Sequence, residues 1–464
     1  MNRAFVAMTR FGYGAGSDDS EARAVASDPQ GWLKAQLDHP DEPSSLQGLP
    51  SGADQMVQLL DFRFQRRQAI LARKAGGMAD DNGAAAAEQQ QASRLRGKDV
   101  QNVYLAEVGG RVGAAIQSRT PFYERLVAFW GNHFTVSGRQ RPEVRPLSGS
   151  FEREAIRPHV TGKFHDMLLA STRHPAMGLF LDNAVSVGPD SPAGLRNHRG
   201  VNENLGREIM ELHTLGVDGG YTEEDVRALA RILTGWSIGR LNAPEPGRFR
   251  FFPALHEPGP KQFLGRTIPE SGEEEGMIAL AMLASHPSTA HHLALQLAKH
   301  FVADNPPPAV VQRLALAYMK SGGDLGIVTR TLVAQPETWS QFGSKIKTPY
   351  DFVISSARAL GRPIEARFAA NSFNILGQPL FGAPSPAGWP DDAASWTGPE
   401  AVMLRLQWAQ AFAERGHDET DPSLLTRAAL MGMADAGLTQ AVARAESRPM
   451  AVAMLLGSPM FQRR

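Results

Sequence analysis

Apolar residues recur every three or four positions along most of the chain, which is the spacing of one face of an α-helix. The pattern predicts helices over residues 54–75, 95–117, 121–133, 175–183, 273–285, 288–302, 308–319, 324–334, 351–360 and 400–414. A strand-like pattern is rare, and its best example predicts a small β hairpin around residues 248–268. The chain is therefore expected to be mostly α, a single large helical domain spanning residues 1–464.

Two segments lack a packing pattern. Residues 74–93 are rich in alanine, glutamine and glycine, and we interpret them as a low-complexity, mobile insertion at a connection or hairpin tip. Residues 376–398 are rich in proline, glycine and tryptophan, so they are not expected to form a regular helix or a central strand. A loop this long inside a compact domain is usually functional or wrapped over the core.

Polar residues gather in the stretch NENLGREIMELHTLGVDGGYTEEDVRALARILTGW, residues 202–236. On a regular helix, Asn204, Glu208 and Glu211 share one face beside an apolar stripe. His213 falls on the opposite side, so the two glutamates and His213 cannot bind one metal ion together. Glu208 lies nearest the stripe, and we expect it to be partly buried with a raised pKa.

The second half of this stretch is mostly explained by helix starts and stops. Gly216 ends the first helix, and Thr222 is placed to cap the second. Asp225 stands three residues later, where a capping box needs an acceptor. Apolar residues over 226–236 form the buried stripe of the second helix. The two helices are predicted to form an antiparallel pair joined at residues 216–221.

The charge balance excludes several classes of function. The 464 residues include 48 basic and 48 acidic side chains, which gives no support for a nucleic-acid binder or a polybasic membrane binder. There is no cysteine, so disulfides, thiolate nucleophiles and iron–sulfur clusters are excluded. The first residues do not read as a signal peptide and no segment is long and apolar enough for a membrane helix. A cytoplasmic location is the default expectation.

Histidines supply further candidates. His133 follows an aromatic-rich helix, where it is either a satisfied structural residue or part of a pocket. His256 lies in a predicted loop, which favours a ligand-binding or catalytic role. The histidines over residues 286–300 scatter outside their helix's apolar stripe, which argues against a metal site there. His-Glu-x-x-His, Gly-x-Ser-x-Gly and Walker motifs are all missing.

Several motifs together resemble the bacterial domain-of-unknown-function 1800 family, nearly from end to end. They are RFGYGA, FWGNHFTVS, HPAMGLFLDN, residues 202–236, GPKQFLG, HPSTAHHLALQLAKHFVADNPPP and LGQPLFGAPSPAGWP. The family pattern falls here on Trp130, His133, Asn183, Asn202, Glu203, Asn204, Glu208, Glu211, Thr234, Gly235, Trp236, Gly388 and Trp389. Family members are frequently encoded beside proteins of the domain-of-unknown-function 1501 family, which resemble alkaline phosphatases and often carry export signals. The resemblance therefore implies such a protein partner and a periplasmic destination reached with it.

Two hypotheses remain open. In the first, the chain is an enzyme with its catalytic residues in a cleft under the Gly388-Trp389-Pro390 loop. Glu208 would be the acid or base, Glu211 the charge partner or metal ligand, and His133 a proton shuttle. The substrate would contact Asn202, Asn204, Trp389, Trp396 and His256. A hydrolase or lyase acting on a polymer such as a polysaccharide, with or without a divalent metal ion, fits these residue types. In the second, the chain is a non-catalytic helical accessory or escort subunit for an exported partner of the 1501 family.

Overall fold

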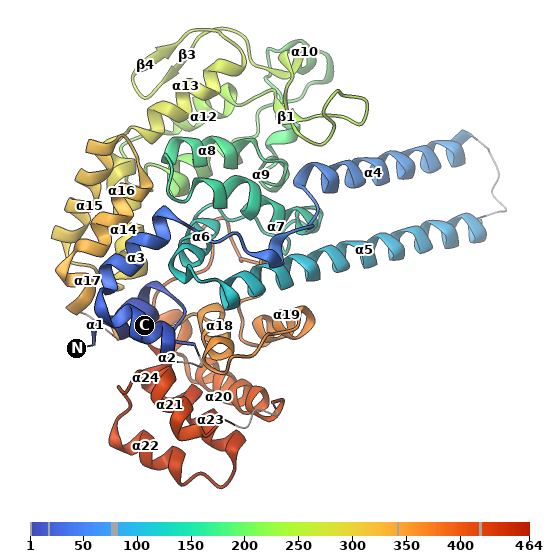
Figure 1. The fold of residues 1–464 in the computed structure, drawn as a ribbon. Helices are drawn as coiled ribbons and strands as arrows, with labels where there is room; N and C mark the ends of the chain where they lie inside the picture. The colour runs from blue at the N-terminus through green and yellow to red at the C-terminus, as the bar shows by residue number, and fades with distance from the viewer. Residues whose placement is uncertain (1, 17–18, 76–81, 341–342, 417–419) are drawn as a thin grey trace.

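A computed structural model describes residues 1–464 except 1, 17–18, 76–81, 341–342 and 417–419, and no side chain is described over 17–20 or 72–95 (Figure 1). The first helices are α1 (Arg3–Val6), α2 (Asp19–Ser27), α3 (Pro29–Asp38), α4 (Gly52–Ala75), α5 (Asn82–Gln117), α6 (Pro121–His133), α7 (Ser148–Phe151), α8 (Phe164–Arg173), α9 (Pro175–Phe180), α10 (Pro192–Asn197), α11 (Asn204–Glu208) and α12 (Glu223–Ile232). The later helices are α13 (Glu273–Ala284), α14 (Pro287–Phe301), α15 (Pro308–Ser321), α16 (Leu325–Ala334), α17 (Pro336–Ser340), α18 (Pro349–Ala359), α19 (Ala366–Ile375), α20 (Pro399–Glu414), α21 (Pro422–Ala429), α22 (Ala436–Ala443), α23 (Arg448–Gly457) and α24 (Pro459–Gln462). The mostly α prediction is confirmed.

Two clusters of buried apolar side chains hold these helices together. The larger cluster runs from Ala4 to Trp339 and fills the space between the helices of the first three quarters of the chain. The smaller cluster joins α5 and the N-terminal Phe5 and Tyr13 to α18–α24. Helices α20–α24 gather at one end of the molecule (Figure 1). The site described below draws its walls from both clusters.

Helices α4 and α5 project from the body as a long pair (Figure 1). The low-complexity stretch 74–93 belongs mostly to this pair, because α4 continues to Ala75 and α5 begins at Asn82. Residues 82–93 are therefore helical rather than a connection, and the interpretation of the stretch as a mobile insertion at a hairpin tip stays a prediction. Alanine and glutamine have high intrinsic helix propensity, which favours a helix without a packing stripe. Residues 76–81 lie outside the described part of the chain.

The central stretch departs from a regular helix. Helix α11 is followed by a π-helical turn, Ile209–His213, whose wider winding shifts the later side chains around the axis. Met210 is consequently buried with Ile209, whereas Leu212, expected in the apolar stripe, is only partly buried. The sequence prediction assumed a rotation of 100° per residue along the whole helix, and this assumption fails at the π-helical turn.

The second helix of the central stretch begins as predicted. Thr222 and Asp225 form a capping box at the start of α12, and Gly206 of α11 packs against the backbone of Val226 and Ala230. Trp236, however, lies beyond the helix. It begins β1 (Trp236–Ile238), which pairs antiparallel with β2 (Phe249–Phe251).

A second antiparallel pair is formed by β3 (Lys261–Phe263) and β4 (Arg266–Ile268), with Lys261 opposite Ile268. This pair is the hairpin expected within residues 248–268. The sequence did not anticipate β1, because its three residues carry no alternating pattern long enough to recognise. No helix in the described part of the chain is both long and apolar enough to cross a membrane.

The capping box yields a stability prediction. Replacing Thr222 by alanine removes the side-chain acceptor for the Asp225 N–H, so the free energy of unfolding should fall by about 1 kcal/mol. Urea unfolding measures the change. Thr439→Ala is the control, since Thr439 lies exposed inside α22 rather than at a cap. An equal loss in both variants would contradict the capping role.

Candidate functional site

A cavity of about 380 Å³ lies beneath the loop of residues 376–398, which we call the covering loop. Its other walls come from α6, from α14, from the start of α18 and from residues 148–152. Both aromatic rings and charged groups line it. The lining residues used below are Arg111, Arg125, Asn132, His133, Glu152, Leu212, His292, Gln296, Lys299, His300, Asp304, Asp351, Trp389, Asp391 and Asp392.

The covering loop is held to α6 by one amide side chain. Asn132 donates to the backbone oxygen of Trp389 at 2.9 Å and accepts from its backbone N–H at 2.8 Å. Gly388, the preceding residue, has φ +80°, and a Cβ there would lie 2.5 Å from the backbone oxygen of Asn132. Glycine is therefore required by both its conformation and the close approach.

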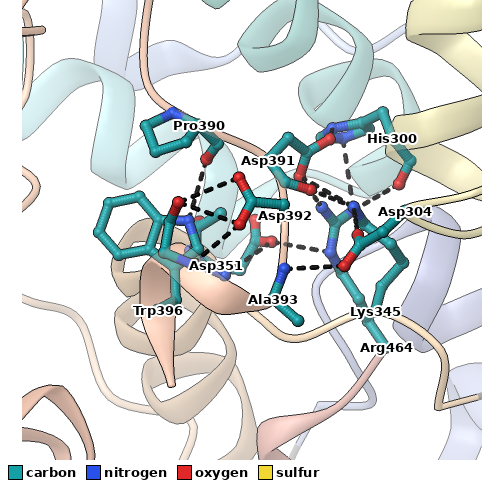
Figure 2. A network of polar contacts seen from close by, with 12 residues as sticks. His300, Asp304, Lys345, Asp351, Pro390, Asp391, Asp392, Ala393, Trp396 and Arg464 are labelled. Atoms are coloured by element: carbon teal, nitrogen blue, oxygen red, sulfur yellow. Dashed lines mark hydrogen bonds and ion pairs between the residues drawn. The ribbon is translucent and has the colours of Figure 1, made fainter. Parts of the chain in front are cut away.

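A second attachment centres on Asp391 (Figure 2). Its carboxylate accepts from His300 Nδ1 at 2.6 Å and from Arg464 Nη2 at 2.8 Å. Lys345 donates to the Asp391 backbone oxygen and pairs with Asp304 at 2.5 Å. Asp304 in turn accepts from the backbone N–H of Ala393 at 2.8 Å. The loop is thus fixed to α14 and its neighbours by charged hydrogen bonds.

Two histidines of the cavity bind the π-helical turn of the central stretch. His133 Nε2 lies 3.1 Å from the backbone oxygen of His213, and His292 Nε2 lies 3.0 Å from that of Leu212. Since a carbonyl only accepts, both rings carry their proton on Nε2. The wide turn leaves these two carbonyls available, and the histidine rings satisfy them.

Burial keeps the histidines in and beside the cavity uncharged near neutral pH. Burial, together with the rings of His213 and His292, lowers the pKa of His133 well below its usual value. Burial also lowers the pKa of His213 to about 3 and that of His300 to about 4. A base this weak is poorly suited to shuttle protons near neutral pH. Among the described residues, no group of three or more histidine or carboxylate side chains is placed to hold a metal ion.

Two buried carboxylates of the cavity have opposite electrostatic surroundings. Burial raises the pKa of Glu152 even though Arg111 lies 3.1 Å away. Burial also opposes the charge of Asp351, but Arg125 at 3.1 Å and Arg464 at 3.2 Å outweigh it and hold the Asp351 pKa well below its usual value. Such a separation of two pKa values within one site is typical of acid–base catalysis.

Glu152 also starts a π-helical turn, Glu152–Ile156. A third such turn, Ala7–Phe11, directly precedes Gly12, whose backbone oxygen accepts two hydrogen bonds from Arg125, at 2.9 and 2.6 Å. All three π-helical turns described in the chain therefore adjoin the cavity or its charged wall. Such turns occur frequently at functional sites.

The structure brings together only part of the predicted site. His133 and Trp389 line the cavity, and Trp396 stands behind Trp389 with ring centroids 6.1 Å apart. Glu208 and Glu211 do not line it. Leu212 is the residue of the central stretch that lines the cavity.

Glu211 is an ion-pair partner rather than a cavity residue. Arg207 lies 3.2 Å from Glu211, 3.3 Å from Glu203 and 2.8 Å from Glu223. Glu208 is partly exposed, and burial with the nearby charge of Glu211 raises its pKa, as its place beside the apolar stripe predicted. No hydrogen bond or ion pair of the Glu208 side chain occurs among the described residues. Catalytic roles for these glutamates remain predictions.

The asparagines of the central stretch take part in hydrogen bonds that involve backbone N–H groups. Asn202 Oδ1 accepts from the backbone N–H of Asn204 at 2.9 Å, immediately before α11, and Asn204 is exposed. The backbone N–H of Asn202 donates to Ser186 Oγ at 3.0 Å. Neither asparagine lines the cavity, so their proposed substrate contacts would require a different surface.

His256 lies elsewhere, in a buried polar cluster. Its Nδ1 lies 2.8 Å from the backbone oxygen of Thr234, and its Nε2 lies 3.0 Å from Glu275. Lys261 pairs with the other oxygen of Glu275 at 2.7 Å. These contacts tie the loop after β2 and the β3–β4 pair to the start of α13, which is a structural role. A substrate contact at His256 remains untested.

Sequence reasoning missed Glu152, Arg111, His300 and Asp391. Glu152 stands in a stretch of mixed charges without a recognisable motif, and Arg111 lies 41 positions before it in another helix. One signal was present for Asp391, because it follows Trp389-Pro390 in the loop singled out as functional. Its partners come from distant positions that only the fold brings together.

The family of the chain follows from a comparison with family models. One model, described as a protein of unknown function, DUF1800, matches residues 6–463. The chain belongs to the DUF1800 family. No curated protein and no solved structure matches this DUF1800 chain. The family supplies no activity, so the function must be argued from the cavity.

Gly388 provides a test of the covering loop. Gly388→Ala in this DUF1800 chain should lower the free energy of unfolding by about 2 kcal/mol or more, because positive φ and the contact with Asn132 both oppose a Cβ. Gly377→Ala is the matched control, since Gly377 lies in the same loop with φ +83° but no atom stands within 4 Å of its would-be Cβ. Urea unfolding measures the loss of unfolding free energy in both variants. Equal losses would show that the Asn132 contact contributes nothing.

The buried histidines predict a pH dependence. The folded-state pKa of His213 is about 3 and that of His300 about 4, against 6.5 for an ordinary histidine, so the unfolded state binds more protons between pH 4 and 6.5. Stability is therefore complete above pH 6.5 and falls as the pH drops toward the folded-state values. His213→Leu should reduce this slope by about 1.4 kcal/mol per pH unit.

Urea unfolding at pH 7.5, 6.5, 5.5 and 4.5 measures the slope. His39→Leu is the control, because His39 is exposed rather than buried. A His213→Leu slope equal to that of the unaltered protein would contradict the burial of a neutral ring at position 213.

Proposed function

We propose that this chain is an enzyme that binds a small polar molecule in the cavity beneath the covering loop, with Glu152 as its general acid. The observation that carries the proposal is the raised pKa of a buried carboxyl at the cavity wall beside Arg111. A nearby arginine ordinarily lowers such a pKa. Here burial outweighs it, aided by the carboxylates of Glu124 and Glu107. A carboxyl that holds its proton closer to neutral pH can donate it to a leaving group.

The cavity favours a molecule of about the size of a monosaccharide. Its 380 Å³ stands near the lower end of ligand-binding pockets, roughly 300–1,000 Å³. The walls combine the rings of Phe129, Tyr350, Phe381 and Trp389 with polar groups, a mixture that suits a sugar ring. Cleavage of a C–O bond by a hydrolase or lyase fits this lining. A polysaccharide would enter only with its terminal residue.

Glu152 takes the acid–base role that the sequence suggested for Glu208, because Glu152 lines the cavity. His133 offers a neutral ring rather than a proton shuttle, since its pKa is far below neutrality. Asp351 is already bound by two arginines and caps α18, so it contributes a fixed charge. Arg111 fixes the position of the Glu152 carboxyl and supports the ring of Tyr350, 4.9 Å from the guanidinium carbon.

The test is Glu152→Gln beside Glu107→Gln. Both glutamates are buried, both pair with an arginine and both have a pKa raised by burial, but Glu107 does not line the cavity. Each variant leaves an arginine unpaired, so both should lose about 3 kcal/mol of stability. Only Glu152→Gln should lower turnover, by about 100-fold or more.

Turnover is measured as 4-nitrophenol release from a panel of 4-nitrophenyl glycosides and glycuronides, at temperatures where both variants are folded by circular dichroism. The unaltered enzyme should lose activity as the pH rises through the Glu152 pKa, since the acid must carry its proton. Equal activity in the two variants, or no turnover of any panel member by the unaltered chain, would count against the proposal.

One observation favours the alternative, an accessory subunit for a partner of the 1501 family. On α20, Val402, Met403 and Leu406 are 42%, 54% and 40% exposed and lie within two turns of each other. Neighbouring exposed apolar side chains can mark a protein-binding surface. The accessory function predicts that both glutamine variants behave alike, so the same experiment separates the two proposals.

A further inference from the structure

One wall of the cavity presents three polar side chains of α14, two of which have no polar partner among the described residues. His292, Gln296 and Lys299 lie at intervals of four and three residues on α14, so they share one face of the helix, and all three line the cavity. Among the described residues, no hydrogen bond or ion pair is formed by the side chains of Gln296 and Lys299. Both are only partly buried, so they remain accessible to a ligand.

The other cations of the cavity wall each lie beside a carboxyl group. Arg111 pairs with Glu152 at 3.1 Å, and Arg125 pairs with Asp351 at 3.1 Å. Within the described residues, Lys299 is therefore the one cationic lining residue without a carboxylate within 4 Å. Its ammonium charge is felt at His292, where it contributes to the lowered pKa.

The remaining carboxylates do not compensate Lys299. Asp304 is bound to Lys345, and Asp391 is bound to Arg464 and His300. Asp392 accepts from the backbone N–H of Ser395 at 2.9 Å and from its hydroxyl at 3.0 Å. These contacts hold the Asp392 carboxylate in its own turn. They orient Asp392 without cancelling its charge, and among the described residues no carboxylate lies within 4 Å of the Lys299 ammonium, so this cation is free to pair with a bound anion.

The cavity also offers a ligand an aromatic ring, the indole of Trp389. Trp389 lines the same cavity from the covering loop, and the double hydrogen bond with Asn132 fixes its backbone. Its ring is half-buried and is backed by Trp396. A rigid indole face favours stacking on a ring, because little conformational entropy is lost on binding.

We propose that the ligand of this cavity is a sugar ring that carries an oxyanion, with the oxyanion bound by Lys299 and Gln296 and the ring stacked on Trp389. The inference rests on the proposed function, which it deepens by naming the substrate class. A carboxylate or a phosphate group supplies the same negative oxygens. A hexuronate is the smallest carboxylate form, and a hexose phosphate is the corresponding phosphate form.

The experiment is isothermal titration calorimetry of the full chain with D-glucuronate, D-glucose 6-phosphate and D-glucose. At least one charged sugar should bind at least 10-fold more tightly than glucose, and the stronger of the two identifies the oxyanion. Lys299→Gln should reduce the affinity for the charged sugar to that for glucose. Lys320→Gln, which removes an exposed lysine of α15 outside the cavity, should change nothing.

Three results would overturn the inference: equal affinity for glucose and the charged sugars, unchanged affinity in Lys299→Gln, or no binding of any of the three. A melting temperature checks that Lys299→Gln is folded. It should equal that of the unaltered protein, because the Lys299 ammonium has no partner among the described residues that the substitution would remove. Failure here is distinct from failure of the proposed function. If turnover still depends on Glu152 alone, the cavity is an active site for an uncharged substrate.

Discussion

The pairing of the Asn132 amide with both backbone groups of Trp389 makes the cavity possible. The covering loop has no sheet or long helix to satisfy its polar backbone atoms, and buried backbone groups left unpaired are costly. Side chains of the body take that role instead. Asn132 binds Trp389, Ser137 donates to the oxygen of Ala383, and Asp304 accepts from the N–H of Ala393. The loop can therefore cross over polar groups without collapsing onto them.

Burial beneath the covering loop also determines how the charged groups there are paired. In a low-dielectric wall an isolated charge is unstable, so most cations and carboxylates occur in pairs and the histidines stay neutral. The pairs are not equivalent. Asp351 is ion-paired with two arginines and remains ionised. Glu152 is ion-paired with Arg111 alone, and burial and the nearby carboxylates outweigh Arg111 and the charge of Arg157, so its proton is held more firmly. Lys299 at the cavity wall has no partner within the described part of the chain, and this difference in compensation gives the cavity its chemical character.

The sequence predicted the architecture more completely than the site. Amphipathic periodicity located α6 at residues 121–133, and the capping residues located the start of α12, because both signals are local. The proline- and glycine-rich composition of residues 376–398 indicated a covering loop, and this loop contributes Trp389 to the wall of the cavity that His133 also lines. The assignment of Glu208 and Glu211 to that cleft relied on a regular helix. The π-helical turn at Ile209–His213 and the pairing of Glu211 with Arg207 are not encoded in a helical pattern.

The most direct measurement is the ionisation of Glu152 itself. Carbon-13 NMR of protein labelled at the glutamate carboxyl carbons, with Glu152 assigned by its absence in Glu152→Gln, follows this group across the pH range without a substrate. A midpoint above 4.5, the ordinary glutamate value, is expected because burial outweighs Arg111. A midpoint at or below 4.5 would show that the arginine dominates and that Glu152 is a structural ion-pair partner rather than an acid.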